Sequence, residues 1–131
     1  MANVIFFSFQ RNDKEQVARI KGRAENSNYS NLNFWVHDLL VPWDTDDESK
    51  IREAISKEIK GTSRTIVFVG NKTHKSKWVQ EEVKMTLERD KPVYAIRLKG
   101  KDLALKPSIL EDNNIKLNSW SESTLQRLAT K

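Results

Sequence analysis

Two continuous apolar runs stand out along the chain, each bounded by polar or turn-forming residues. The first covers residues 4–7, and the second covers residues 65–69 and is closed by Gly70 and Asn71. Short runs rich in β-branched and aromatic residues are typical of strands that are buried on both faces. We therefore predict two central strands that lie side by side in a sheet.

Three further strands are predicted with less apolar character. Residues 32–37 alternate between apolar and polar side chains, a period typical of a strand with one exposed face. Residues 93–98 follow Pro92, which is tolerated at the first position of a strand. Residues 115–117 form a short, weaker run. We expect the half-polar strand at 32–37 to lie at an edge of the sheet.

The segments between the strands carry apolar residues at helical spacing. The predicted stripes are Val17, Ile20 and Ala24, then Ile51, Ile55 and Ile59, then Val79, Val83, Thr86 and Leu87, and finally Leu125 and Leu128. Asn12 and Asp13 each precede a Glu or Gln by three residues, so two overlapping capping boxes predict the first helix start. Ser76 and Ser121 are predicted N-caps of later helices.

Strands that alternate with helices predict a parallel sheet with helices on both faces, joined by right-handed crossovers. With the two apolar strands adjacent and 32–37 at the edge, the strand order is 2-1-3-4-5. The fold class is therefore a three-layer, flavodoxin-like α/β domain with a five-stranded, mainly parallel sheet. A length of 131 residues accommodates one such domain, so we expect a single domain over residues 1–131.

In sheets of this order the ligand crevice lies at the carboxyl ends of the strands, between the first and third. The residues that the prediction places at this edge are Ser8, Phe9, Asp38 and Asn71. The apolar connection at residues 39–44 contains Trp43 and follows directly. The helix that starts at Ser76 also points its first turns toward this crevice.

Two adjacent glutamates on that helix are predicted to have different surroundings. At about 100° per residue, Glu81 points away from the apolar stripe, whereas Glu82 lies on the flank of the stripe beside Trp78. Glu82 is therefore the candidate for a carboxylate shielded from water. Its alternative role is a helix-start carboxylate that complements the macrodipole, worth ~0.3–1 kcal/mol.

Composition excludes several kinds of chemistry. The chain has no cysteine and two histidines, so a thiolate zinc site, a Cys nucleophile and a histidine-only metal site are excluded, and we expect no metal. A net charge of +5 comes from 23 basic and 18 acidic residues that are interspersed, unlike the clustered cations of a nucleic-acid interface. No apolar run approaches the ~20 residues of a membrane span, and residues 1–3 lack the basic region and cleavage site expected of a signal peptide. We expect a cytoplasmic protein that binds neither membrane nor nucleic acid.

The sequence also lacks the motifs that bind the usual ligands of this fold. A phosphoacceptor site needs an aspartate where Gly70 stands, and dinucleotide or Walker loops need closely spaced glycines, of which the whole chain has four. The crevice is instead lined by aromatic, amide and carboxylate side chains. Such a lining suits a neutral to cationic ligand with a ring that can stack on aromatic side chains. It suits a bare phosphate less well.

Three short stretches together resemble one family. These are FFSF at residues 6–9, TIVFVG at residues 65–70 and WVQEE at residues 78–82. They are similar to bacterial TIR-like proteins, in particular the ThsB-type TIR subunits of Thoeris anti-phage defence systems, over roughly residues 3–98. In enzymatic TIR domains the glutamate of the Trp-x-x-x-Glu motif is the catalytic residue of NAD⁺ cleavage, which implies this role for Glu82.

The resemblance implies further properties as expectations. NAD⁺ would be the substrate, with no separate cofactor, and an ADP-ribose-derived signal would activate a separate effector protein. A trigger, which could be phage-derived, or TIR–TIR self-association would complete the site, so we expect the resting protein to have little activity. The implied substrate-binding residues are Ser8, Phe9, Asp38, Trp43, Asn71 and Trp78.

A second functional class remains open, in which the same fold serves as a non-catalytic interaction module. For most of these residues an ordinary structural role is also open. Trp78 and Phe9 could pack in the core, Trp43 could pack within its loop, and Asp38 could end a strand at a turn.

Overall fold

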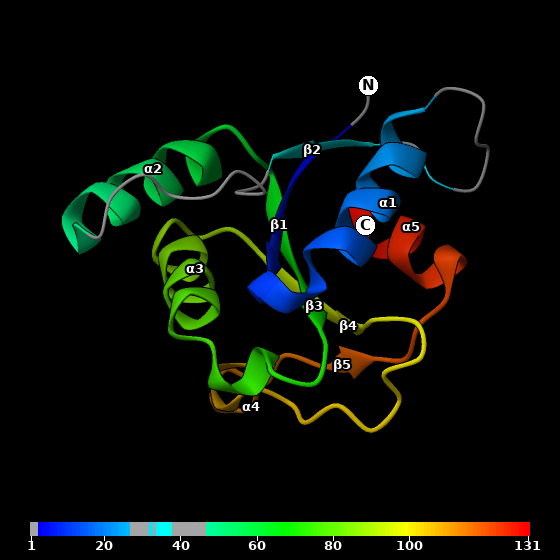
Figure 1. Cartoon of the computed structure of the whole chain (residues 1–131). Coiled ribbons are helices and arrows are strands. Elements are labelled where there is room, and N and C mark those ends of the chain that lie inside the picture. The colour runs from blue at the N-terminus through cyan, green and yellow to red at the C-terminus, as the bar shows by residue number, and fades with distance from the viewer. Residues whose placement is uncertain (1–2, 27–31, 33, 38–46) are drawn as a thin grey trace.

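The computed structural model describes residues 3–26, 32, 34–37 and 47–131. In this part of the chain, five parallel strands form one sheet with the order β2-β1-β3-β4-β5 (Figure 1). The strands are β1 (Val4–Phe9), β2 (Trp35–His37), β3 (Arg64–Val69), β4 (Val93–Arg97) and β5 (Leu117–Asn118). The predicted fold class and strand order are therefore confirmed, and the sheet is parallel throughout.

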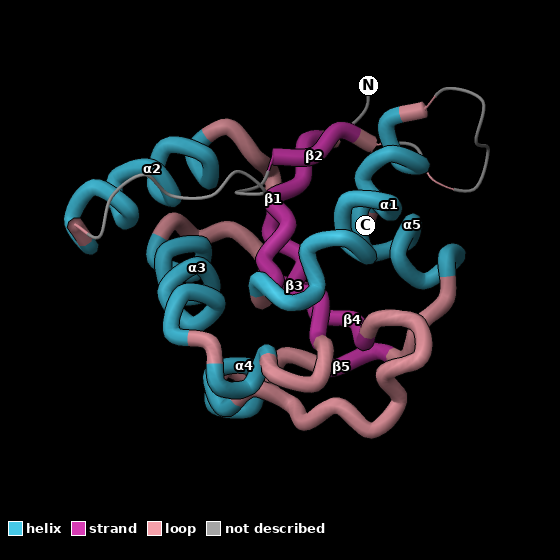
Figure 2. The backbone as a smooth tube through the Cα atoms, viewed as in Figure 1, coloured by secondary structure: helices cyan, strands magenta, loops and turns pink. Residues whose placement is uncertain are grey.

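Helices cover both faces of the sheet, which confirms the three-layer prediction (Figures 1 and 2). One layer contains α1 (Lys14–Glu25) and α5 (Glu122–Thr130), and the other contains α2 (Glu48–Lys60), α3 (Lys77–Glu88) and α4 (Ser108–Asp112). The helical stripes predicted from the sequence are the buried faces of α1, α2, α3 and α5. Amphipathic helices bury such stripes because apolar surface is driven out of water.

The alternation of side chains along the central strands separates two cores. On β1, Phe7 faces α1 and α5, where its ring contacts those of Phe34 and Phe68 edge-on at 5.9 and 4.5 Å. Phe6 faces the other way, into a cluster with the isoleucines of α2. Successive residues of a strand point to opposite faces, so each residue of β1 belongs to one layer only.

The two edge strands differ most from the prediction. Pairing in β2 is limited to residues 35–37, although Leu32 and Phe34 before it are buried as the alternation predicted. Trp35 is 55% exposed on this edge strand. β5 begins two residues later than predicted and covers Leu117–Asn118, and the connection before it contains the short helix α4.

The helix starts are capped partly as predicted. The side chains of Ser76 and Ser121 accept hydrogen bonds from the backbone N–H groups of Val79 and Thr124, which confirms both as N-caps. The predicted capping boxes at Asn12 and Asp13 are wrong, because the Asp13 side chain makes no cap hydrogen bond. A short 3₁₀ turn over Arg11–Asp13 precedes α1 instead. Among the described residues, none of the helices is long and apolar enough to cross a lipid bilayer.

Candidate active site

The carboxyl end of β1 and the first turns of α3 bring Ser8 and Glu82 together. Ser8 lies two residues after Phe6, so both side chains face the layer that contains α3. The Ser8 hydroxyl Oγ donates a hydrogen bond of 2.6 Å to Oε1 of Glu82. Ser8 is fully buried, and Glu82 is 6% exposed. The sequence prediction that Glu82 is shielded from water therefore agrees with the structure.

Burial changes the acidity of Glu82. Desolvation raises the pKa of its carboxyl group from 4.5 to about 8, and the hydrogen bond from Ser8 opposes this rise. Among the described residues, no Lys, Arg or His side chain forms an ion pair with Glu82. A buried carboxylate without a cationic partner is unstable, so the group is poised to gain a proton or to receive a positive charge.

The backbone at Glu82 is held against the sheet by two threonines. Thr86 Oγ1 donates a hydrogen bond of 2.8 Å to the carbonyl oxygen of Glu82, one helical turn earlier. The Thr86 hydroxyl is also 2.6 Å from the hydroxyl of Thr65 on β3. Since the Thr86 proton is used on the carbonyl, Thr65 is the donor to Thr86. All these groups are buried, so the position of Glu82 relative to the sheet is well defined.

Trp78 lies one turn before Glu82 and packs between α2 and α3. Its partly buried ring contacts the cluster of Phe6 with the isoleucines of α2. Two cations flank the ring: Arg52 Cζ is 5.7 Å and Lys77 Nζ is 5.5 Å from the ring centre. Trp78 therefore packs against α2 one helical turn before Glu82, where its ring interacts with these cations.

Glu81 is less exposed than the helical geometry predicted. Its side chain is 22% exposed, and its Oε2 lies 3.4 Å from Nε of Arg52 on α2. Arg52 and Lys77 also pair with Glu48, so four charged side chains connect α2 with α3. The two adjacent glutamates still differ in their partners. Glu81 pairs with the cation of Arg52, whereas Glu82 accepts a hydrogen bond from the hydroxyl group of Ser8.

The other predicted site residues are not gathered around Glu82. Phe9 lies on the opposite face of β1 and packs against the core beneath α1 and α5. Asn71 is exposed in the turn after β3, at the same edge of the sheet as Ser8. Asp38 and Trp43, with the connection at residues 39–44, lie outside the described residues.

A second buried carboxyl group was missed by the sequence prediction, which assigned Asp13 to a helix cap. Asp13 is 8% exposed, and its Oδ2 is buried and has no hydrogen-bond partner in the part of the chain that the structure describes. Burial raises the pKa of the Asp13 carboxyl, and the nearby charge of Lys101 partly opposes this. The carboxyl lies directly against the backbone of Gly70, where an added Cβ would be 2.3 Å from Oδ2. The sequence carried no signal for this contact, because it joins residues from different crossover connections.

The described residues favour a limited range of chemistry. They contain no group of three or more His, Cys, Asp or Glu side chains that could hold a metal ion. When ionised, the Glu82 carboxyl can stabilise a cation that develops next to it, with Ser8 fixing its orientation. When neutral, it can donate a proton.

Comparison with known protein families identifies one family that matches most of this chain. The sequence model for the family described as Thoeris protein ThsB, TIR-like domain, matches residues 6–102 of this chain. No curated protein sequence matches this chain. The match includes Ser8, Trp78 and Glu82.

Solved structures show the same fold at low sequence identity. The TIR domain in the crystal structure of the RPS4 and RRS1 TIR domain heterodimer superposes with a TM-score of 0.55 and 14% identity. That alignment covers 98% of this chain and 92% of the other. The TIR domains of the activated Roq1 resistosome, which directly recognises the pathogen effector XopQ, align with a TM-score of 0.49 and 14% identity over 97% of this chain and 69% of theirs.

Proposed function

Because the chain belongs to the TIR-like domain family of the Thoeris protein ThsB, we propose that it consumes NAD⁺ and cleaves the bond between nicotinamide and ribose. The observation that carries the proposal is the Glu82 carboxyl group. It is buried, it has no cationic partner among the described residues, and a hydroxyl group orients it. A strongly perturbed pKa at the ligand edge of such a sheet favours a functional group over a structural one.

The chemistry needs little beyond a carboxylate. When the nicotinamide–ribose bond breaks, the bonding electrons leave with the ring, which departs as neutral nicotinamide. Positive charge then moves to the ribose in an oxocarbenium-like transition state. The ionised carboxyl group of Glu82 stabilises this cation in a site with little water. Water, or a hydroxyl or ring nitrogen of the ADP-ribose moiety, then adds to C1′ and releases a proton.

Ser8 has a positioning role in this proposal. Its hydroxyl donates to Oε1 of Glu82, which favours the ionised carboxylate and fixes its direction. Trp78 shields the same carboxyl from water on the α2 side. Phe9, Asp38, Trp43 and Asn71 remain proposed substrate contacts, and Phe9 would act from the opposite face of β1.

The wider biological role is proposed from the family to which the chain belongs. We propose that an ADP-ribose-derived product, cyclic or conjugated, activates a separate effector protein after a phage-derived trigger. We also propose that TIR–TIR self-association completes the site, which predicts activity that rises more than linearly with protein concentration. The RPS4 and RRS1 TIR domains form a heterodimer in their crystal structure, which supports TIR–TIR contact as the proposed mode of assembly.

The test is a matched pair of substitutions on one helix. Glu82→Gln keeps the size of the side chain and removes its charge, and Glu81→Gln makes the same change at the neighbouring position. Wild type and both variants are incubated with NAD⁺ at high protein concentration, with and without lysate of phage-infected cells, and products are identified by mass spectrometry. We expect Glu82→Gln to lose about 10²–10³ in rate and Glu81→Gln to stay near wild type.

Thermal melting of each variant is the control for folding. If a folded Glu82→Gln variant cleaves NAD⁺ at the wild-type rate, Glu82 is not the catalytic carboxylate. If wild type consumes no NAD⁺ under any of these conditions, the interaction-module function takes the place of the enzyme.

A further inference from the structure

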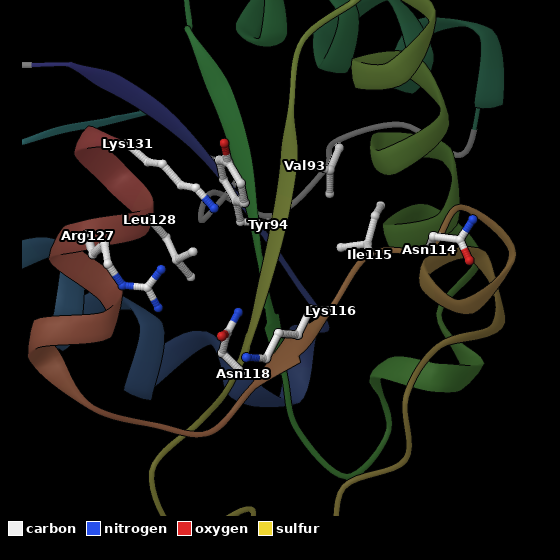
Figure 3. Close-up of a pocket in the computed structure, with 9 residues that line it drawn as sticks. All are labelled: Val93, Tyr94, Asn114, Ile115, Lys116, Asn118, Arg127, Leu128 and Lys131. Atoms are coloured by element: carbon white, nitrogen blue, oxygen red, sulfur yellow. The ribbon is translucent and has the colours of Figure 1, made fainter.

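A cavity of about 330 Å³ opens beside β4 (Figure 3). It forms because β5 begins at Leu117, opposite Ala95. The two preceding residues of β4, Val93 and Tyr94, therefore extend beyond β5 and line the cavity. None of the lining residues belongs to β1 or α3, and β3 separates β4 from β1.

The cavity has a strongly cationic rim. Lys116 lies just before β5, and Arg127 and Lys131 reach toward the cavity from α5 and its end (Figure 3). No Asp or Glu is among the lining residues, and none of these three cations forms an ion pair with any described residue. Like charges that converge repel one another, so an anion bound between them is stabilised.

A fourth cation, behind this rim, holds the end of α5 in place. The buried guanidinium of Arg64 donates hydrogen bonds to the backbone oxygens of Leu128, at 3.1 Å, and Lys131, at 2.9 Å. These bonds orient the backbone that carries Arg127 and Lys131. The guanidinium group of Arg64 also places a positive charge at the C-terminus of α5, where the helix dipole alone would disfavour an anion.

The walls of the cavity are apolar and partly aromatic. Leu128 is buried, and the ring of Tyr94 is half-buried. Lys131 Nζ lies over this ring, 5.2 Å from its centre. Asn118 is held in place by the hydrogen bond from its Nδ2 to the carbonyl oxygen of Ala95, 3.0 Å away. Apolar walls with a few convergent polar groups, at a volume near 300 Å³, are typical of small-molecule sites.

We propose that this cavity binds a small organic phosphate of about mononucleotide size. Its phosphate lies between Lys116, Arg127 and Lys131, and its organic part packs against Tyr94 and Leu128. A peptide strand added to β4 fits poorly, because only Val93 and Tyr94 are free of β5 at the end of β4 beside the cavity. The site is distinct from the proposed NAD⁺ site and does not depend on NAD⁺ cleavage.

The test uses AMP as the probe, with adenosine and inorganic phosphate as comparisons. Binding is measured by isothermal titration calorimetry and located by NMR on ¹⁵N-labelled protein. The variant Lys116→Gln/Arg127→Gln removes two cations from the rim. The control Lys50→Gln/Lys57→Gln removes two exposed cations from α2 and so lowers the net charge equally.

We expect saturable AMP binding with shifts at the backbone amides of Tyr94, Lys116 and Leu128. The rim variant should bind AMP about tenfold or more weakly, and the control variant should match wild type. Equal weakening in both variants, shifts confined to Ser8 and Glu82, or binding of inorganic phosphate as tightly as AMP would each overturn the proposal. So would binding of a single-stranded oligonucleotide without binding of AMP.

Discussion

Replacing Glu82 by Gln should stabilise the folded protein, and the gain should grow with pH. The Glu82 carboxyl has its pKa raised from 4.5 to about 8 by burial. It therefore binds a proton more tightly in the folded state than in the unfolded chain. The stability linked to that proton is fully present below pH 4.5 and is lost as the pH rises through about 8.

The size of the effect follows from the shift. Each pKa unit is worth about 1.4 kcal/mol, so ionisation of Glu82 destabilises the wild-type fold by roughly 5 kcal/mol at pH 9. At pH 5 the same linkage amounts to about 1 kcal/mol or less. Gln does not titrate, so Glu82→Gln escapes this loss. For a chain of this length the difference in melting temperature between variant and wild type should widen by roughly 10–20 °C between pH 5 and pH 9.

The assay is thermal unfolding followed by circular dichroism at pH 5, 7 and 9. Glu81→Gln is the matched control, since Glu81 is partly exposed and lies beside Arg52. A difference between Glu82→Gln and wild type that stays constant across this pH range would refute the reasoning. It would mean that the carboxyl group is hydrated or paired in solution.

Three further predictions concern the same end of the sheet. If Glu82 acts as a carboxylate, kcat/KM for NAD⁺ should rise with pH up to about 8, and Ser8→Ala should move this rise to higher pH because the Ser8 hydrogen bond lowers the Glu82 pKa. Asp13→Asn should raise the melting temperature more at pH 8 than at pH 4, because burial raises the Asp13 pKa and disfavours its charged form. Gly70→Ala should destabilise the fold by about 1–3 kcal/mol in urea denaturation, because its Cβ would strike the Asp13 carboxyl. Pairing it with Asp13→Ala should recover most of that loss, and a strictly additive double variant would contradict the contact.

Hydrophobic periodicity was sufficient to predict the architecture. The continuous apolar runs became the central strands β1 and β3, and the alternation at residues 32–37 marked the edge. These patterns are strong because each strand buries one or both faces, so the side chains must match the layers. β2 was predicted too long and β5 was predicted to start two residues too early, because pairing at an edge depends on the neighbouring connections rather than on the strand's own residues.

The candidate site was predicted only in part. Helical geometry placed Glu82 beside the buried stripe, but its hydrogen bond to Ser8 joins residues 74 positions apart and depends on the packing of α3 on β1. The alternation along β1 did contain the information that Ser8 and Phe9 face opposite layers. The contact of Glu81 with Arg52 and that of Asp13 with Gly70 could not be predicted, because each joins segments whose relative placement no local pattern encodes.

The acidity of Glu82 links substrate binding to the resting state of the proposed enzyme. With a pKa of about 8, Glu82 is mostly neutral at pH 7 in the free protein, which spares the fold a buried, unpaired charge. NAD⁺ carries a positive nicotinamide ring, and a cation next to a carboxyl group lowers its pKa. Binding in the catalytic orientation would therefore ionise Glu82 and release a proton. The same carboxyl that destabilises an empty site at high pH would then be stabilised by its substrate, and its charge would appear where the transition state needs it.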